Sequence, residues 1–124
     1  MRHRVDHRKL GRTSEHRIAL LRNLVSSLLE HGRVTTTLAK AKEARRYAEK
    51  AITLGKKAIA AADAAGKLHY SRQALSTLNN REAVKRLIGE VAGKYTERKG
   101  GYTRIYRAGY RLGDHAEVAI LELV

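Results

Sequence analysis

Arg33-Val-Thr-Thr-Thr-Leu-Ala-Lys-Ala-Lys-Glu43 is the stretch of this chain that decides its fold. Its first five residues are rich in β-branched side chains, which fit a pleated sheet, and they predict a short strand from Arg33 to Thr37. Thr37 is a good cap for the helix that follows, which we expect to run from Leu38 to about Ala61. A strand that leads directly into a long helix predicts a chain with both element types.

The predicted long helix has an apolar stripe on one face and cations on the others. Small and aliphatic residues recur at helical spacing and predict the buried face: Leu38, Ala41, Ala48, Ile52 and Ile59. The remaining faces carry the cations Lys40, Lys42, Arg45, Arg46, Lys50, Lys56 and Lys57. This helix therefore has one face for a core and a larger surface for water or an anionic partner.

A second amphipathic helix is predicted upstream of the strand. Thr13 or Ser14 can cap it, and Glu15 in its first turn suits the positive end of the helix dipole. Gly32 can adopt positive φ and is expected to end it. Its apolar stripe is Ile18, Leu21, Val25, Leu28 and Leu29.

The rest of the chain completes an α+β pattern. Residues 63–67 resemble a linker or a frayed helix end, and residues 69–78 predict a short helix. Asn80 can cap a further helix over residues 81–92, which Gly93 is expected to end before a basic loop. Strands are expected over residues 102–109 and 117–123, joined through Gly113-Asp114. With residues 34–37 they predict a small mixed three-stranded sheet against several helices.

The first seventeen residues, MRHRVDHRKLGRTSEHR, are rich in Arg, Lys and His and show no apolar periodicity before Ile18. Over the whole chain, 26 Lys and Arg face 12 Asp and Glu, and the formal net charge is +14. We interpret residues 1–13 as an extended basic arm and residues 14–124 as a single α+β domain. A domain with such an arm is expected to bind a polyanion.

Several function classes have no support in the sequence. The chain has no Cys, which excludes disulfides and thiolate metal sites. It shows no secretory signal pattern and no apolar run of the roughly 20 residues that a membrane helix needs, so we expect a cytoplasmic protein without a membrane partner. His3, His7 and His16 lack the ordered helical spacing of a metal site. Without a Ser/His/Asp arrangement, we expect no enzyme, no cofactor and no small-molecule substrate.

The candidate contacts to a polyanion, of which a nucleic acid is the most plausible, are the cations of the arm and of the two helices. Arg side chains can bind phosphate oxygens through two parallel hydrogen bonds, although a charged helix face can also be simply solvated. Thr35 and Thr36 have hydroxyls that can reach an RNA backbone, although strand propensity explains them equally well. The candidate cations and histidines are Arg2, His3, Arg4, Arg8, Lys9, Arg12, His16, Arg17, Arg22, Lys40, Lys42, Arg45 and Arg46.

The last third of the chain adds a second candidate group. Tyr102, Arg104 and Tyr106 alternate onto one strand face, while Thr103, Ile105 and Arg107 take the other. The tyrosines can stack on bases or cover the core side of the sheet. The turn at Lys99-Gly100-Gly101 lets backbone approach a phosphate, but without a following helix it is not a nucleotide-binding loop. Lys99, Tyr102, Arg104 and Arg107 complete the candidate set.

Four blocks of residues occur together in a known order. They are Met1-Arg-His-Arg4 with Arg8-Lys-Leu-Gly-Arg-Thr-Ser14, His16-Arg17 and Arg22-Asn-Leu24; then Thr35-Thr-Thr-Leu-Ala-Lys-Ala-Lys-Glu43; then Gly100-Gly-Tyr-Thr-Arg-Ile105; then Ile120-Leu-Glu-Leu-Val124. In these blocks the chain resembles the family of bacterial-type large-subunit ribosomal protein seventeen. The resemblance implies an α+β fold, large-subunit ribosomal RNA and neighbouring large-subunit ribosomal proteins as partners, a place near the exit face of the subunit, and no catalysis.

The sequence therefore predicts a structural constituent of the large ribosomal subunit that binds and bridges ribosomal RNA through its arm and basic helix faces. Two alternatives stay open at this point. Net charge alone would also permit a nucleoid-type DNA-binding protein, although no recognition helix or dimer pattern stands out. An RNA-processing factor would need a catalytic constellation, which the sequence does not show.

Overall fold

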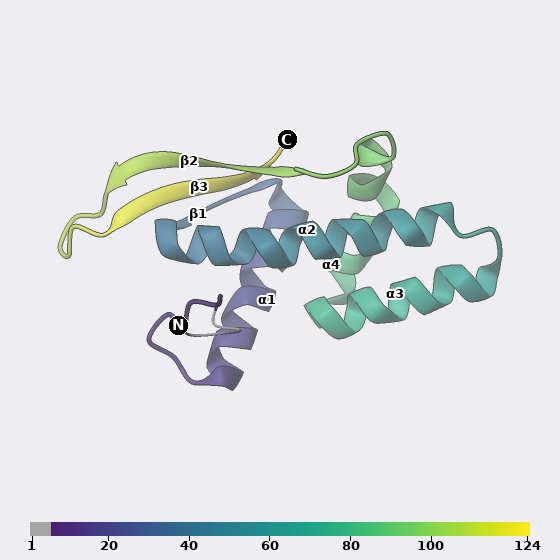
Figure 1. Cartoon of the computed structure of the whole chain (residues 1–124), viewed down its shortest axis with the longest axis horizontal. Coiled ribbons are helices and arrows are strands. Elements are labelled where there is room, and N and C mark those ends of the chain that lie inside the picture. Colours follow the sequence, from purple (N-terminus) through teal and green to yellow (C-terminus); the bar gives the residue numbers. More distant parts are fainter. Residues whose placement is uncertain (1–5) are drawn as a thin grey trace.

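The computed structural model describes residues 6–124, which form four α-helices and a three-stranded sheet (Figure 1). The first two helices lie against one face of the sheet, and the other two pack on those helices. The elements follow the chain as α1 (Ser14–His31), β1 (Arg33–Thr37), α2 (Leu38–Ala60), α3 (Ala64–Leu78), α4 (Arg81–Arg86), the π-helical η1 (Leu87–Val91), the 3-10 helical η2 (Ala92–Tyr95), β2 (Thr103–Tyr110) and β3 (Glu117–Leu123). The predicted α+β class is confirmed.

The strand order is β1-β3-β2, so the last strand of the chain lies in the centre of the sheet. Both pairings are antiparallel, with Leu121 of β3 opposite Val34 on one side and Ile105 on the other. The expectation of a mixed sheet was therefore wrong. The direction of a pairing between segments as distant as β1 and β3 leaves no trace in local sequence patterns, which report only that each segment is a strand.

The two faces of the sheet have opposite characters because successive side chains alternate. The inner face carries Ala119 and Leu121, which are fully buried under the helices, with Val34 and Ile105 packed beside them. The outer face carries Arg33, Arg104 and Glu122 at paired positions. The sheet is thus covered by helices on the inner face alone (Figure 1).

Helix α2 is the central element, and small residues let its neighbours approach closely. Its buried side is made largely of alanines, and Ile52 is fully buried. Gly55 has no room for a side chain, because an added Cβ would lie 2.9 Å from Cγ of Leu87 and 3.0 Å from Cβ of Ala92. The largest fully buried side chains of the core are Leu21, Val25, Leu28, Leu29, Ile52, Leu87 and Leu121.

Local signals placed the first three elements well. Gly32 ends α1 with φ of 83°, and its N–H donates to the carbonyl of Leu28. The strand and the start of α2 lie where the sequence predicted them. Two residues of the predicted stripes lie outside the core, however, because Ile18 is 43% and Ile59 36% exposed.

Two boundaries after α2 differ from the prediction. Residues 64–67 are not a linker but the first turn of α3, and the Asp63 carboxylate caps that turn by accepting a hydrogen bond from the N–H of Gly66 at 2.9 Å. Asn80 caps α4 as predicted, but Gly93 does not end the helical segment. Gly93 keeps negative φ within η2, so the chain continues helically to Tyr95.

The carboxylate of Glu49 fixes the start of β2 against α2. Its Oε2 accepts a hydrogen bond from the N–H of Tyr102 at 3.1 Å, and its Oε1 accepts from the N–H and Oγ1 of Thr103 at 3.1 and 2.7 Å. Hydrogen bonds to a charged group are among the stronger ones in proteins. Residues far apart in the sequence are thereby held side by side, and this sets the spacing between α2 and β2.

Candidate nucleic-acid interface

A groove with a cationic rim lies between the first half of α2 and strand β2. Its volume is about 400 Å³, and it is lined by Leu38, Lys42, Arg45, Arg46, Ile105 and Arg107. Leu38 and Ile105 are partly buried against the core, and the other four side chains are cations. We call this the basic groove.

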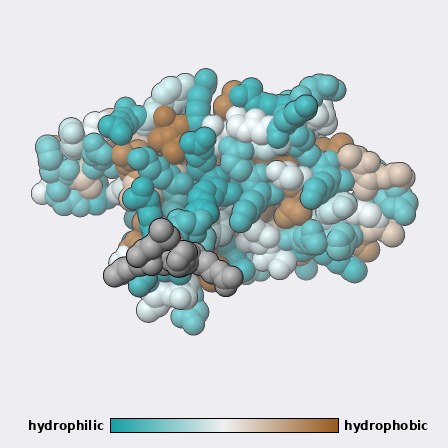
Figure 2. Space-filling view, viewed as in Figure 1, coloured by the Kyte–Doolittle hydropathy of each residue, from teal (hydrophilic) through white to brown (hydrophobic). Residues whose placement is uncertain are grey.

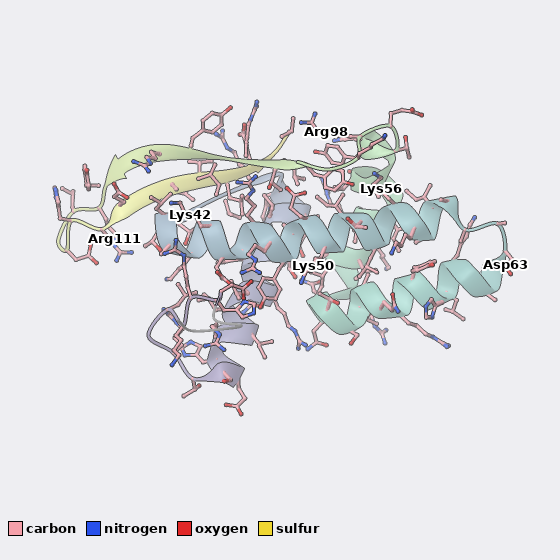
Figure 3. The ribbon with its side chains drawn as sticks, in the orientation of Figure 1. Lys42, Lys50, Lys56, Asp63, Arg98 and Arg111 are labelled. Atoms are coloured by element: carbon pink, nitrogen blue, oxygen red, sulfur yellow. The ribbon has the colours of Figure 1, made fainter. Side chains whose placement is uncertain are left out.

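Helical and strand periodicities bring these four cations together. Lys42, Arg45 and Arg46 are spaced i, i+3 and i+4, so they share one face of α2. Arg107 follows Ile105 by two residues and therefore lies on the inner face of β2. Figure 3 shows Lys42 near the beginning of α2, where the helix passes under the strands.

Three of the four cations keep their charge uncompensated. Within residues 6–124, Lys42, Arg45 and Arg107 have no carboxylate oxygen within 4.0 Å. Like charges that gather without acidic partners create a positive potential that attracts anions. The groove is therefore suited to anions by its electrostatics, and its cations come from both α2 and β2.

Arg46 differs from the other three because it is bonded to the N-terminal segment. Its Nη2 donates to Oδ2 of Asp6 at 2.7 Å and its Nη1 donates to the Asp6 backbone carbonyl at 2.9 Å. The side-chain hydrogen bond from Arg46 is the main cause that lowers the pKa of Asp6 below its ordinary value. One cation of the basic groove is thus paired with an acid of the chain itself.

The described part of the predicted arm, residues 6–13, lies against the domain at two further places. Nδ1 of His7 lies 3.5 Å from Oε1 of Glu43, a carboxylate that is almost fully buried on α2. Leu10, with φ of 57°, packs against the core. Arg8 and Lys9 point into solvent, whereas Nη1 of Arg12 donates to the carbonyl of Leu10 at 2.5 Å. The candidates Arg2, His3 and Arg4 lie outside the described residues.

The remaining candidates on helices lie away from the basic groove. Lys40 precedes Lys42 by two residues, which places it about 200° around α2. His16 is exposed at the start of α1 and Arg17 is partly exposed. Arg22 lines a hollow of about 330 Å³ between α1 and the end of α3, whose other walls include Ile18 and Leu78.

The outer face of the sheet holds a separate group of candidates. Nε of Arg104 donates to Oε1 of Glu122 at 2.7 Å, and its guanidinium lies over the ring of Tyr106, 5.2 Å from the centroid. The hydrogen bond from Arg104 lowers the pKa of Glu122. Thr35 is on this outer face, opposite Ile120, and Thr36 is on the inner face, opposite Ala119. Arg104 is thus paired within the protein, with a carboxylate that Arg33 also contacts at 3.5 Å.

Tyr102, a candidate for stacking on a base, is buried in this structure. It precedes β2 and is only 3% exposed, with its ring tilted against Tyr95 at a centroid distance of 5.3 Å. Its hydroxyl accepts a hydrogen bond from Nζ of Lys56 at 2.9 Å. The ring is therefore a core element in this structure, as the alternative interpretation had it, and is not open to a base.

Lys99 lies at a second cationic hollow that the sequence analysis did not single out. This hollow, of about 550 Å³, lies between α2, α3 and the loop before β2, and Lys50 and Lys57 also line it. Lys50 is labelled on the side of α2 that faces α3 (Figure 3). Hydrophilic residues dominate the face shown in Figure 2, and the apolar ones form only small separate patches.

Residues 6–124 offer neither a metal site nor a membrane-spanning helix. No three His, Asp or Glu side chains gather there in an arrangement that would hold a metal ion. In the same part of the chain, no helix combines the length and the apolar character needed to cross a membrane.

The profile of one protein family, described as ribosomal protein L17, matches residues 20–124. The chain belongs to this family. It is 55% identical over its full length to the large ribosomal subunit protein bL17 of Desulfotalea psychrophila, of which it covers 90%. It is 55% identical over 96% of its length to bL17 of Clostridium kluyveri and 54% identical over 95% to bL17 of Clostridium tetani, and it covers 98% and 97% of these relatives.

Membership in the L17 family confirms the resemblance drawn from the four blocks of residues. It makes the chain a structural component of the large ribosomal subunit and not an enzyme. The basic groove is accordingly a surface of a ribosomal protein.

Proposed function

We propose that this chain binds large-subunit ribosomal RNA mainly through the basic groove. The observation that carries the proposal is the meeting of four cations from α2 and β2 in one groove, three of them without an acidic partner in the described chain. Folded RNA packs phosphates closely, and bound cations relieve their repulsion. The planar guanidinium of Arg45 or Arg107 can donate two parallel hydrogen bonds to one phosphate.

The arm extends this surface. Residues 1–13 carry Arg2, Arg4, Arg8, Lys9 and Arg12, with His3 among them, and the described part of the arm begins at the end of the basic groove, beside Arg46. We propose that arm and groove contact the same region of RNA and so bridge segments of it. The cations His16, Arg17 and Arg22 of α1 and Lys40 of α2 would then contact RNA on other sides of the domain, which suits a protein enclosed by RNA.

The family also indicates the partners of the chain and its location in the cell. We propose that neighbouring large-subunit proteins contact the chain and that it acts within ribosomes of the cytoplasm. The family favours RNA over the duplex DNA of a nucleoid protein, and neither a membrane nor a small-molecule substrate has a role in the proposal.

The test is RNA affinity measured against salt. In-vitro transcribed fragments of large-subunit ribosomal RNA would be titrated with the full chain, and fluorescence anisotropy would report binding. If about six phosphates are neutralised, the logarithm of the binding constant should fall with the logarithm of salt with a slope between roughly −4 and −5. Lys42→Ala and Arg107→Ala should each reduce the slope by about 1, because each removes one phosphate contact.

Lys85→Ala is the matched control, because Lys85 is an exposed lysine of α4 that lies 3.7 Å from a carboxylate oxygen of Glu82. It should leave both affinity and slope close to those of the unmodified chain. If the groove variants bind RNA as well as this control does, the basic groove is not the RNA site.

A further inference from the structure

The hairpin of β2 and β3 reaches past the beginning of α2, so its tip is not covered by the helices (Figure 1). At this tip the rings of Tyr110 and His115 are stacked, with centroids 4.3 Å apart and an interplanar angle of 1°. Tyr110 remains 59% exposed although His115 covers one side of its ring. The pair therefore presents a flat aromatic surface to the surroundings.

A β-bulge at Ala108 turns this pair toward the basic groove. Arg107 is opposite Ala119 and Tyr110 is opposite Glu117, so both residues lie on the inner face of the sheet. Without the extra residue, strict alternation would have placed Tyr110 on the outer face. Arg107 of the basic groove is thus followed along the same face by the stacked rings, and cations and aromatic surface form one continuous path.

The tip is held in shape before anything binds to it. Nε and Nη2 of Arg111 donate to the two carboxylate oxygens of Asp114 at 3.0 and 2.5 Å, and Oδ1 of Asp114 also accepts from the N–H of Ala116. Two backbone hydrogen bonds, from Arg111 to Ala116 and from His115 to Arg111, close the turn. Figure 3 shows Arg111 at this far end of the hairpin. A tip ordered in advance loses little conformational freedom on binding.

We propose that the Tyr110–His115 pair is a stacking platform for an unpaired base of the RNA strand that lies in the basic groove. This inference rests on the proposed function and adds to it the kind of RNA that the groove takes, namely single-stranded RNA at its β2 end. A positive groove that follows the backbone, ending in aromatic rings that receive bases, is how proteins bind unpaired nucleic acid.

A protein partner is the other occupant to consider, because Leu112 at the tip is 98% exposed. The rings continue the cationic path, and this favours RNA. Arg107 beside the rings can bind a phosphate, whereas an apolar pocket on a protein would offer its charge no partner. Leu112 also supplies the control for the test, being an exposed residue of the same turn that contributes nothing to the ring pair.

The test uses the full chain and a short oligouridine that carries a single 2-aminopurine. Stacking on an aromatic ring should quench the fluorescence of this base analogue. Tyr110→Ala should abolish the quenching and weaken binding by about 5- to 150-fold, the range for loss of one base–aromatic stack. Tyr110→Phe should behave as the unmodified chain, and so should Leu112→Ala. Melting temperatures of all variants would show that the domain remains folded.

The outcomes separate this inference from the proposed function. If Tyr110→Ala binds and quenches normally while Lys42→Ala and Arg107→Ala bind weakly, the platform is wrong and the groove stands. If neither set of variants changes binding, both proposals fail. If Tyr110→Ala and Leu112→Ala bind RNA normally but enter the large subunit poorly when its proteins are present, the tip is a protein-docking element and the inference is overturned.

Discussion

The guanidinium of Arg46 lies 2.7 Å from the carboxylate of Asp6, and this contact joins the N-terminal segment to the basic groove. It also gives the groove an internal competitor, because Asp6 occupies donors of Arg46 that a phosphate could otherwise use. The free protein and the RNA-bound protein are therefore expected to differ at this contact.

Asp6→Asn tests this competition. The variant should expose amides of residues 6–13 to faster hydrogen exchange, because one anchor of the segment is lost, and it should bind RNA somewhat more tightly, because an acid leaves the groove. Since Arg46 lowers the pKa of Asp6, the contact is present above the ordinary Asp pKa and is lost as pH falls through the lowered value. Glu97→Gln, at an exposed acid outside the arm, is the control for the change in net charge. Unchanged exchange in residues 6–13 would show that Asp6 does not anchor the segment.

The carboxyl of Asp114 should titrate at unusually low pH. Hydrogen bonds from Arg111, and next from the N–H of Ala116, lower its pKa from 3.8 to about 2. Because the folded-state value is lowered, the carboxylate stabilises the hairpin tip above about pH 4, and this stabilisation is lost as pH falls toward 2. NMR signals of Leu112 and His115 should therefore change between these pH values, and Arg111→Gln should move the titration of Asp114 upward. A carboxyl that titrates near 4 in the unmodified chain would contradict the geometry of the tip.

Gly55→Ala should destabilise the domain even though alanine favours helices. The added Cβ would lie 2.9 Å from Cγ of Leu87, so α2 and η1 would have to move apart, and overpacking of this kind costs about 1–3 kcal/mol. The matched control is Gly89→Ala, also helical, where no atom lies within 4 Å of the added Cβ. That variant should be equal to the unmodified chain or more stable by about 0.5–1 kcal/mol. Urea unfolding of both variants measures the difference, and equal midpoints would mean that the contact at Gly55 is not tight.

These features show what local sequence signals can and cannot reveal. Gly32 and the β-branched run after it predicted the end of α1 and the whole of β1 because helix termination and strand propensity depend on a few adjacent residues. The separation of Lys40 from Lys42 also follows from helical periodicity alone. The sequence therefore placed three of the four groove cations on α2, and it placed the fourth, Arg107, on the opposite face of its strand from Arg104.

The features of the structure that the sequence did not predict all depend on contacts between distant residues. The sequence has no signal that Asp6 meets Arg46, or that β1 pairs with β3 in the antiparallel direction. The bulge at Ala108 could not be predicted either, because a strand with a bulge has the same kinds of residues as a regular one. The bulge nevertheless moves Tyr110 to the other face of the sheet. Strand alternation therefore gave no reason to place Tyr110 beside Arg107, and it gave no sign that Tyr102 packs against Tyr95 in the core.

Folding and RNA binding should respond to different residues, and two variants separate them. Leu28 is fully buried in the core, so Leu28→Ala should lower stability by about 2–5 kcal/mol and should change RNA affinity only through the unfolded fraction. Arg8 is exposed in the arm, so Arg8→Ala should change stability by no more than about 0.5 kcal/mol. If its guanidinium is buried against phosphate in the complex, RNA binding should weaken by about 10- to 150-fold, the range for a hydrogen bond between charged groups. Melting temperature and anisotropy would be measured on both. An Arg8→Ala chain that unfolds easily yet binds RNA normally would mean that the arm serves the fold, and that the division between a binding arm and a packed domain is wrong.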